Sequence, residues 1–218
     1  MKRILVYGAT GRTGSLLLAY ALQQGYAVTA LVRHPEKLLL TDAYLTVVRG
    51  QPTNLADVRR AMPGCDFVLS ALSALSEAES FSRKKITPPH TLETTMRHTI
   101  TAMHELGLRR IVTLSSIGAG DSRPYAPWYM RLIIKLTNFK LVFADHDRQE
   151  TLLRQSDLAW TIARPVALNN KEQLGQLVVR YQQTPAPFAL SRRQLAKFMV
   201  DCLATDDFLH QAPLLAEK

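Results

Sequence analysis

The sequence has few cysteines and no long apolar run. Cys65 and Cys202 are the only cysteines among 218 residues. Their spacing fits neither a metal site nor a redox motif, so we expect two reduced thiols, a cytoplasmic location and no metal ion. No run of about 18 apolar residues is present, which argues against a transmembrane helix, and we expect no membrane partner. The first residues lead directly into an apolar segment without a small-residue cleavage site, so no signal peptide is expected.

Acidic residues are outnumbered by basic ones. The chain has 27 Lys and Arg against 18 Asp and Glu, a formal net charge of +9. A basic surface can attract nucleic acid, anionic lipid or anionic small molecules. The densest cluster is Arg83, Lys84 and Lys85, with only Phe81 nearby as an aromatic residue, and the other cations are scattered. No zinc-finger, RNA-binding or DNA-binding signature is present, so we expect solvated surface charge and no nucleic-acid partner.

Apolar residues alternate between short buried runs and helical stripes along the chain. Strands are predicted at 3–8, 27–33, 45–50, 65–72, 109–116 and 158–165, with further candidates at 176–181 and 212–217. Helices are predicted at 13–25, 55–62, 91–107, 126–137, 143–156 and 191–203. The last of these begins at Ser191, whose hydroxyl is suited to cap a helix N-terminus. With 47% hydrophobic residues, one domain spanning 1–218 is expected.

This alternation predicts an α/β fold, a single-domain Rossmann-like doubly wound parallel sheet flanked by helices. The predicted strands are uniformly apolar, as a sheet covered on both faces requires. Ligands of such sheets bind at the carboxyl ends of the strands. We therefore expect functional residues just after the strands, Ala71 and Leu72 among them. The segments at about 73–90, 117–143 and 166–175 are expected to form an acceptor site.

Three glycines directly follow the first predicted strand in the stretch "GATGRTG". Gly8 would permit a tight turn, Gly11 would let the backbone approach a pyrophosphate, and Gly14 would let the helix pack close to the strand. The helix N-terminus would offer free N–H groups and partial positive charge, with hydroxyl donors from Thr10 and Thr13. Because the pattern opens the first βαβ unit, it predicts dinucleotide binding.

The residue after the second strand bears on the choice of cofactor. NAD-specific sites carry Asp or Glu there to accept from the ribose 2′-OH. This chain has Arg33, and no carboxylate follows until Glu36. A guanidinium can form charge-assisted bonds with a 2′-phosphate, and Arg12 could supply a second cation. The sequence therefore predicts NADP as the cofactor, with NAD less favoured.

The glycine spacing resembles that of the atypical short-chain dehydrogenases/reductases. More narrowly, the chain resembles the group of NmrA-like proteins, biliverdin-IXβ reductases and NADH-flavin reductases. Four more stretches carry the resemblance: "VRHPEKL", "RRIVTLSSIGAG", "DRQETLLRQSDLAWTIARPVAL" and "SRRQLAKFMVDCL". It covers nearly the whole chain outside about 76–90 and 121–142. The resemblance implies an NAD(P)H-dependent oxidoreductase, which we expect to be a monomer or a homodimer.

The sequence departs from this family at two points. Short-chain dehydrogenases usually carry Tyr-x-x-x-Lys, in which the lysine helps the tyrosine donate a proton. No tyrosine of this chain has a lysine four residues later. Gln51 stands where the family usually has Asp after the third strand. The departures argue against a sugar epimerase or dehydratase reaction.

Two candidate site regions follow from the resemblance. Ser115, at the end of the fifth predicted strand, would hydrogen-bond the substrate or the cofactor amide, unless it is an ordinary serine at a strand end. The backbone at Pro165 and Val166 would lie near the nicotinamide carboxamide, although a proline also simply ends a strand.

Two residue pairs are spaced to share a helix face. His146, four residues before Glu150, could donate a proton to a bound acceptor. The alternative is a surface ion pair. Tyr125 and Tyr129 lie in an aromatic segment that could cover a flat ring. The alternative is a buried or dimer-forming helix.

Together these features predict an NADPH-dependent reductase that passes hydride to a flat acceptor such as a flavin or a quinone. Ser115, His146 and Tyr125 are the candidate catalytic residues. The alternative is a non-catalytic NADP(H)-binding redox sensor or regulatory protein of the NmrA-like type. The missing Tyr-x-x-x-Lys motif favours this alternative, and the "SRKK" loop and the apolar stretch 128–143 would then contact a protein partner.

Overall fold

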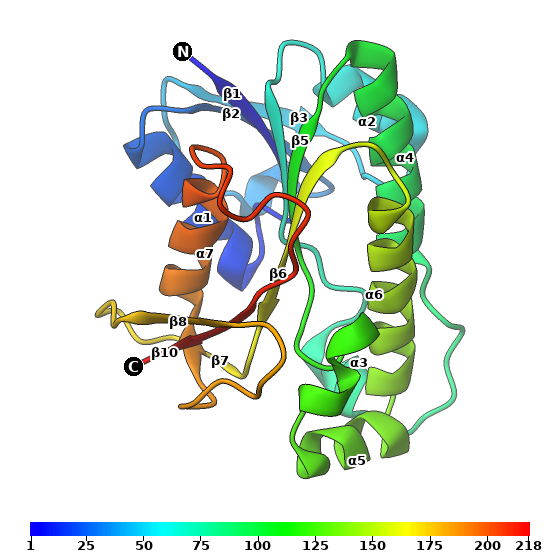
Figure 1. Cartoon of the computed structure of the whole chain (residues 1–218). Coiled ribbons are helices and arrows are strands. Elements are labelled where there is room, and N and C mark those ends of the chain that lie inside the picture. The colour runs from blue at the N-terminus through cyan, green and yellow to red at the C-terminus, as the bar shows by residue number, and fades with distance from the viewer.

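A twisted eight-stranded sheet runs through the computed structural model, which describes residues 1–218 (Figure 1). Its strands are β1 (Arg3–Tyr7), β2 (Ala27–Val32), β3 (Leu45–Arg49), β4 (Phe67–Ser70), β5 (Arg110–Leu114), β6 (Ala159–Pro165), β8 (Leu177–Arg180) and β10 (Leu214–Glu217). They are ordered β3-β2-β1-β4-β5-β6-β10-β8. All neighbours are parallel except β8 and β10. The order reverses between β1 and β4, the place where doubly wound sheets bind ligands.

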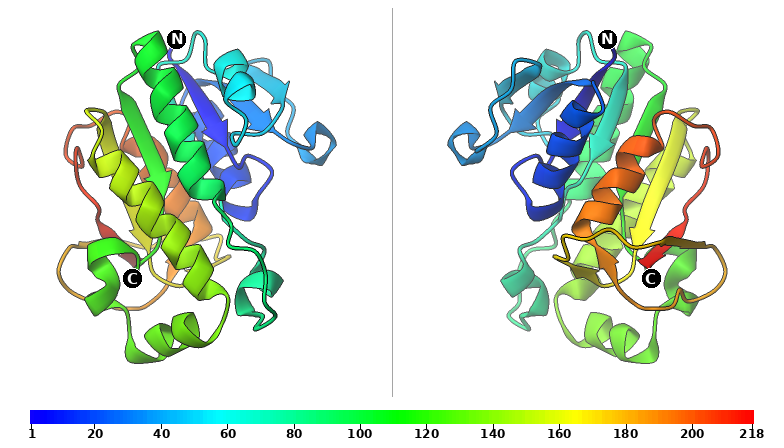
Figure 2. Two further views of the ribbon diagram at one scale, coloured as in Figure 1. Left: turned by 90° about the vertical axis from the view of Figure 1, so that its right-hand side faces the viewer. Right: turned by 90° about the vertical axis from the view of Figure 1, so that its left-hand side faces the viewer.

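Helices cover both faces of the sheet (Figure 2). One face carries α1 (Arg12–Gln23) and α7 (Arg192–Asp201); the other carries α2 (Leu55–Ala61), α4 (Thr91–Leu106) and α6 (Phe139–Arg154). The smaller elements are the 3₁₀ turns η1 (Pro35–Lys37) and η2 (Gly120–Tyr125), the helices α3 (Glu77–Phe81) and α5 (Trp128–Leu136), and a two-stranded sheet of β7 (Leu168–Asn169) and β9 (Leu190–Ser191). Both α3 and α5 lie at the carboxyl end of the parallel strands (Figures 1 and 2). The predicted fold class is thus confirmed.

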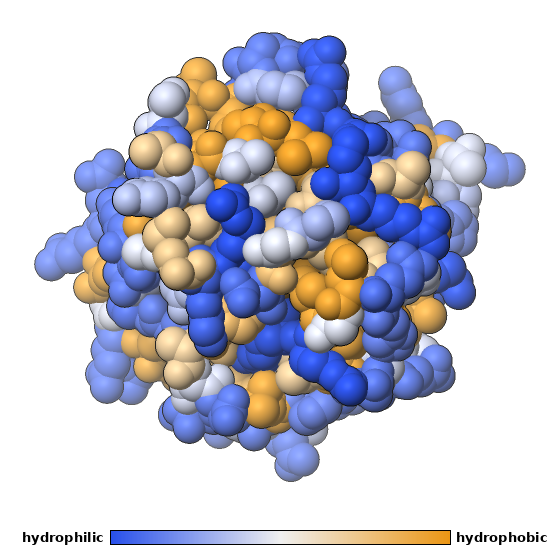
Figure 3. All heavy atoms as spheres, turned by 90° about the horizontal axis from the view of Figure 1, so that it is seen from above, coloured by the Kyte–Doolittle hydropathy of each residue, from blue (hydrophilic) through white to orange (hydrophobic).

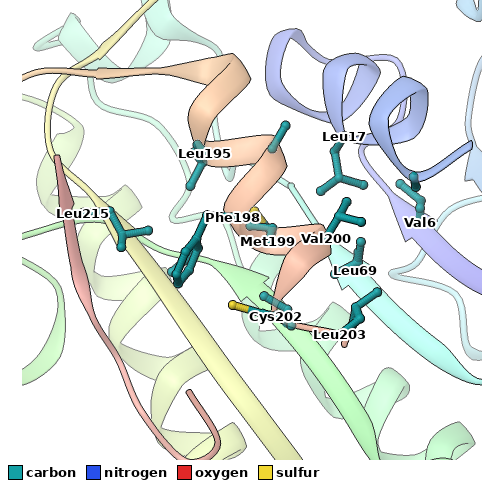
Figure 4. Close-up of a cluster of buried hydrophobic side chains, with 14 of the residues drawn as sticks. Val6, Leu17, Leu69, Leu195, Phe198, Met199, Val200, Cys202, Leu203 and Leu215 are labelled. Atoms are coloured by element: carbon teal, nitrogen blue, oxygen red, sulfur yellow. The ribbon is translucent and has the colours of Figure 1, made fainter. Parts of the chain in front are cut away.

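Each face of the sheet has its own hydrophobic core. The first core contains 28 buried residues from the sheet, α1 and α7. Figure 4 shows Phe198 and Met199 of α7 in this layer, with Leu17 of α1 and Leu215 of β10. The second core contains 17 buried residues from the sheet, α2, α4 and α6. Burying a large apolar side chain contributes roughly 1.5–3 kcal/mol, so both layers stabilise the sheet and the helices packed on it.

Side-chain hydrogen bonds fix the N-termini of α7 and α4. The predicted cap of α7 is confirmed, because Ser191 Oγ accepts from the Gln194 N–H at 3.1 Å. Helix α4 has no side-chain cap of its own. Instead, the fully buried Asp145 of α6 accepts from the N–H groups of Leu92 (2.9 Å) and Glu93 (3.1 Å). A carboxylate there also interacts favourably with the helix dipole. Asp145 therefore ties the first turn of α4 to the side of α6.

The final strands add one antiparallel pair to the predicted parallel sheet. The candidates at 176–181 and 212–217 are confirmed as β8 and β10, but β8 runs antiparallel to β10. The expectation of uniformly buried strands is also wrong at β3, where Val47 is 42% exposed. β3 is an edge strand, so helices cover less of it than of the central strands.

The helix predicted at about 126–137 is observed as α5, but it begins two residues later than predicted. Tyr125 ends the 3₁₀ turn η2, and α5 begins only at Trp128, after Pro127. A proline fixes its own φ and pushes the preceding residue out of helical geometry. Tyr125 and Tyr129 therefore do not share a helix face, which corrects that prediction. Helix α3 lies in a stretch where the sequence predicted no helix.

The close contact between α1 and β1 yields a prediction about stability. A Cβ on Gly14 would lie 1.9 Å from the Gly8 carbonyl oxygen, whereas a Cβ on Gly11 would lie 3.2 Å from it. Gly14→Ala must therefore push α1 off the sheet, and we expect it to cost roughly 1–3 kcal/mol or more of unfolding free energy. Gly11→Ala is the matched control and should cost less than about 1 kcal/mol. Urea unfolding measures both; equal losses would contradict the packing role of Gly14.

Candidate functional site

The glycine loop leaves a position at the start of α1 where no side chain caps the helix. Gly8 has φ +79°, and a Cβ there would lie 2.6 Å from the Ala71 carbonyl oxygen. Gly11 is the N-cap residue of α1, and no side chain caps this helix or places a carboxylate in its first turn. The first N–H groups of a helix have no partner within the helix. Together with the helix dipole they can bind a phosphate group.

The other predicted loop residues surround this position. Thr13 is buried in the first turn of α1 and Thr10 is exposed beside it. The Ala71 N–H donates to the Tyr7 carbonyl at 3.1 Å, which aligns the end of β4 with the end of β1. Leu72 packs against the second core. The structure thus brings Ala71 and Leu72 next to the glycine loop.

Arg33 directly follows β2 and is exposed, with no hydrogen bond or ion pair. The carboxylate nearest to it in sequence is engaged elsewhere, because Glu36 contacts His34 Nδ1 at 3.1 Å and Arg49 at 3.5 Å. Arg12 is exposed too, but its guanidinium pairs with Glu77 of α3 at 2.7 Å. The sequence predicts that Arg12 and Arg33 both bind the 2′-phosphate. Of the two, only Arg33 has a guanidinium without an ion pair.

Arg192 is a third cation near this position, and our sequence reasoning missed it. It lies in the first turn of α7, where its Nη1 donates to Asn170 Oδ1 at 2.7 Å. Its pKa is lowered, first by burial and then by the neighbouring Arg12. The only signal for it in the sequence is its place directly after the capping Ser191.

A buried ionic group lies under the end of β5. Ser115 Oγ donates to Glu150 Oε1 at 2.6 Å, and Arg164 Nε donates to the same oxygen at 3.0 Å. Arg164 Nη2 also pairs with the second oxygen of Glu150 and with Asp121 Oδ1, the latter at 2.5 Å. Ser115, Glu150 and Arg164 are each at most 3% exposed. The alternative of a surface ion pair between His146 and Glu150 is therefore wrong.

This group also fixes the loop above it. Burial alone would lower the pKa of Arg164, but Glu150 and Asp121 raise it overall, so the guanidinium stays charged. Gly120, at φ +54°, packs so closely that a Cβ would lie 2.7 Å from both Arg164 Nη2 and Glu150 Oε2. Because the Ser115 hydrogen points to Glu150, the Ser115 hydroxyl presents lone pairs rather than a hydrogen to a ligand.

His146 is buried on the same helix as Glu150. Burial lowers its pKa to about 4, and its Nδ1 has no hydrogen-bond partner. The ring lies edge-on to Phe143, with 6.3 Å between centroids. At neutral pH the imidazole is therefore uncharged, so the expected role of an imidazolium proton donor is not supported. A neutral ring still offers one N–H and one lone pair.

The two tyrosines lie in different surroundings. Tyr125 is half-buried against the first core, and its carbonyl accepts from Thr184 Oγ1 at 2.7 Å. Tyr129 is 45% exposed, with its ring 6.3 Å from that of Phe188. Helix α5 contains no buried residue, which contradicts the buried-helix alternative. Covering a ring and forming an interface both remain open to this segment.

The end of β6 lies beside the end of β5. The Ser115 N–H donates to the Ala163 carbonyl at 2.8 Å, and the Ile117 N–H donates to the Pro165 carbonyl at 3.1 Å. These bonds bring Ser115 and Pro165 together as expected. The Val166 N–H, however, donates to Leu215 of β10 at 3.0 Å. It is not free to bind a carboxamide in this conformation.

A solvent-filled hollow lies next to the buried group of Ser115, Glu150 and Arg164, on the side of Gly120 and Asp121. A polar hollow of about 500 Å³ is lined by Gly120, Asp121, Arg123, Asp147, Glu150, Thr151 and Arg154. Its charges are already paired, Arg123 with Asp147 at 2.5 Å and Arg154 with Asp121 at 3.3 Å. The structure contains no cluster of three or more His, Cys, Asp or Glu suited to a metal ion. None of its helices combines the length and apolar character needed to cross a bilayer.

Known proteins resemble this chain in sequence and in fold. A family model described as NAD(P)H-binding matches residues 8–206. An uncharacterized chloroplastic protein of Arabidopsis thaliana is 28% identical over 214 residues, which cover 94% of this chain and 73% of that protein. A short-chain dehydrogenase/reductase of Veillonella parvula, solved in complex with NADP, has a TM-score of 0.79 at 19% identity, covering 99% of this chain and 94% of its own. ChuY of Escherichia coli O157:H7, described as an anaerobilin reductase, has a TM-score of 0.81 at 19% identity, covering 99% and 97%.

The buried imidazole predicts a specific pH dependence of stability. His146 has a pKa of about 4 when folded and about 6.5 when unfolded, so the unfolded chain binds the extra proton between these values. Stability is therefore complete above about pH 6.5 and falls as the pH drops towards 4. This group alone should cost about 2 kcal/mol between about pH 7.5 and pH 5.

Urea unfolding at the two pH values measures this cost. In His146→Gln the loss between them should be smaller by about 2 kcal/mol. The control is Leu39→Ser, which changes a 95% exposed residue without a titratable group and should leave the pH dependence as it is. If His146→Gln keeps the full pH dependence, another group is responsible.

Proposed function

The chain belongs to the NAD(P)H-binding family. From this premise we propose that it is an NADPH-dependent reductase that passes hydride to a flat acceptor such as a flavin or a quinone. The observation that carries the proposal is the position of Ser115. It lies at the same carboxyl edge of the sheet as the uncapped start of α1, two strands away in the order β1-β4-β5. An extended dinucleotide bound by its pyrophosphate at α1 can reach Ser115 with its other end.

The residues at this edge fit a dinucleotide with a 2′-phosphate. The first turn of α1 would bind the pyrophosphate, and Arg33 would bind the 2′-phosphate with help from Arg12. Ser115 and Pro165 would lie beside the ring that supplies the hydride. The NADP complex of the Veillonella protein, which has the same fold, supports this cofactor.

The proposed acceptor follows from the lack of a strong proton donor at the carboxyl edge of the sheet. The chain has no Tyr-x-x-x-Lys motif, and the buried His146 is uncharged at neutral pH. A flavin or a quinone accepts hydride with little help from a protein acid, so orientation and exclusion of water suffice. Ser115 can orient such a ring through its lone pairs, and the aromatic residues of η2 and α5, Tyr125 among them, lie at the same end of the sheet.

The missing motif also favours a second function, a non-catalytic NADP(H)-binding sensor of the NmrA-like type. A reductase would consume NADPH when an acceptor is present, whereas a sensor would bind NADPH without consuming it. Purified protein is mixed with NADPH and a panel of flavins, quinones and tetrapyrroles, and the absorbance of the reduced nicotinamide is followed. We expect faster loss than without protein and than with Gly11→Val, whose side chain would occupy the place of the pyrophosphate. Loss at the background rate across the whole panel would overturn the reductase and favour the sensor.

Cofactor preference tests the role of Arg33. A charged hydrogen bond contributes roughly 1.5–3 kcal/mol, about 10- to 150-fold in affinity. We expect the protein to bind NADPH more tightly than NADH, and Arg33→Ala to weaken NADPH binding at least tenfold while NADH binding barely changes. Lys37→Ala, a nearby exposed cation, is the control. Calorimetric titration that finds equal affinities in the parent protein would contradict this role.

Ser115 has a matched control in its neighbour. Ser115→Ala should lower turnover roughly tenfold or more, because an orienting hydrogen bond is worth about 1–3 kcal/mol. Its effect on NADPH affinity should be smaller, and Glu150 keeps its bonds to Arg164. Ser116 Oγ bonds only the Ile117 carbonyl, at 3.2 Å, so Ser116→Ala should keep full activity. Equal turnover in parent and Ser115→Ala would leave Ser115 a purely structural residue.

A further inference from the structure

Helix α5 turns its apolar side to solvent. Its five most exposed large apolar residues are Trp128 (71%), Tyr129 (45%), Leu132 (47%), Ile133 (39%) and Leu136 (48%). Trp128, Leu132 and Leu136 are spaced i, i+4 and i+8, and Tyr129 and Ile133 form the adjacent row, so they share one face of the helix.

The opposite side of α5 is the side that faces the protein. Met130 packs against the first core, and Ile134 lies close to Gly118 in the loop after β5. The exposed apolar face is therefore available to a partner.

The apolar face is surrounded by cations. Segments 80–92 and 124–144 contain no Asp or Glu. They contain six exposed cations without an ion pair: Arg83, Lys84, Lys85, Arg131, Lys135 and Lys140. The carboxylates that flank these segments in the sequence are engaged elsewhere. Glu77 pairs with Arg12, and Glu79 accepts from Ser76. Glu93 pairs with Arg97 and Arg148, and Asp145 is fully buried. The net local charge is therefore strongly positive.

The two segments form one continuous surface, which we call the α5 surface. The Asn138 side chain donates to the Lys84 carbonyl at 3.0 Å, and its N–H donates to the Ser82 carbonyl at 2.9 Å. The half-exposed Phe81 ring meets that of Phe139 edge-on, with 4.8 Å between centroids. These contacts hold the basic loop beside the start of α6, and α6 in turn packs against α5.

We propose that the α5 surface docks on an anionic lipid membrane. Apolar side chains with Trp and Tyr on one face, flanked by Lys and Arg, are suited to the boundary between headgroups and acyl chains. Lys and Arg beside them are attracted to anionic headgroups. Docking of this kind buries one face of a helix and needs no spanning segment. The proposal therefore departs from the sequence expectation of no membrane partner.

A second copy of this chain fits the surface less well. A two-fold dimer would place the same patch on both subunits face to face. The six cations of each copy would then oppose those of the other without any carboxylate between them, which like-charge repulsion disfavours. An anionic bilayer satisfies the apolar and the basic residues at once.

The opposite end of the molecule has a different surface. Figure 3 shows that end, where hydrophobic residues are interrupted by hydrophilic ones. The α5 surface, by contrast, lies at the carboxyl end of the sheet (Figures 1 and 2). Docking would thus place the carboxyl edge of the sheet next to the lipid. Lipid binding does not depend on reductase activity, and vesicle binding can be measured without an acceptor substrate.

Trp128 allows a direct test of insertion. Trp160 is the only other tryptophan and is 5% exposed in the second core. In Trp160→Phe, fluorescence therefore reports on Trp128 alone. Vesicles of phosphatidylcholine with an equal part of phosphatidylglycerol should shift its emission to the blue, and brominated acyl chains should quench it. Vesicles of phosphatidylcholine alone should bind at least tenfold more weakly, and added salt should weaken anionic binding.

Variants locate the binding surface by vesicle flotation. Trp128→Ser with Leu132→Ser, and separately Lys84→Glu with Lys85→Glu, should each reduce binding at least tenfold. Their positions are exposed, so folding is not at risk, and NADPH affinity serves as the check. The controls are Leu39→Ser, at an apolar residue 95% exposed elsewhere, and Lys37→Glu, at an exposed cation near it. Both should bind as the parent protein does.

Three results would overturn lipid docking. The first is a lack of quenching by brominated anionic vesicles. The second is a dimer in sedimentation equilibrium that Trp128→Ser with Leu132→Ser converts to a monomer while the parent protein ignores vesicles. The third is binding to polyglutamate without binding to anionic vesicles, which would assign the surface to an acidic protein.

Discussion

The ion pair between Arg164 and Glu150 holds together the parts of the candidate site that come from distant places in the chain. It links the end of β6 to α6, and through Ser115 and Asp121 it reaches the end of β5 and the turn η2. An ion pair this deeply buried is costly to break, about 3–5 kcal/mol when one partner is removed. The same pair leaves no room for a side chain at Gly120. The hydroxyl of Ser115 is therefore held by a rigid support rather than by a flexible loop.

The carboxyl edge of the sheet has two chemically different ends. At the glycine loop, the uncapped α1 and the exposed Arg33 offer positive charge to a phosphate. Around Ser115, the buried His146 is uncharged and the remaining charges are paired with one another. This division suits a ligand with an anionic end and a flat uncharged end, which is the form of a reduced nicotinamide dinucleotide. The same division is consistent with the proposed reductase, in which the edge would orient rings rather than supply an acid.

Beyond the edge, α3 and α5 add features that the sheet itself does not require. Helix α3 is attached to α1 by the exposed pair of Arg12 and Glu77. An exposed pair of this kind is worth at most about 1 kcal/mol, so Arg12 can be released to a bound phosphate at little cost. Helix α5 buries none of its residues, and its apolar face increases stability only when something covers it.

The sequence by itself determined the α/β fold, the order of its main elements and the glycine loop. These depend on local patterns, because apolar periodicity decides strand or helix and three glycines within seven residues decide a tight turn and close packing of α1 on β1. Only the tertiary structure decided the partners of charged and polar side chains. Helical spacing paired Glu150 with His146, but the folded chain pairs it with Arg164 on the next strand. Asp145 likewise caps α4 from more than fifty residues away, and α5 is exposed although its residues are apolar. Such contacts depend on which surfaces meet in space, and no local sequence pattern records that.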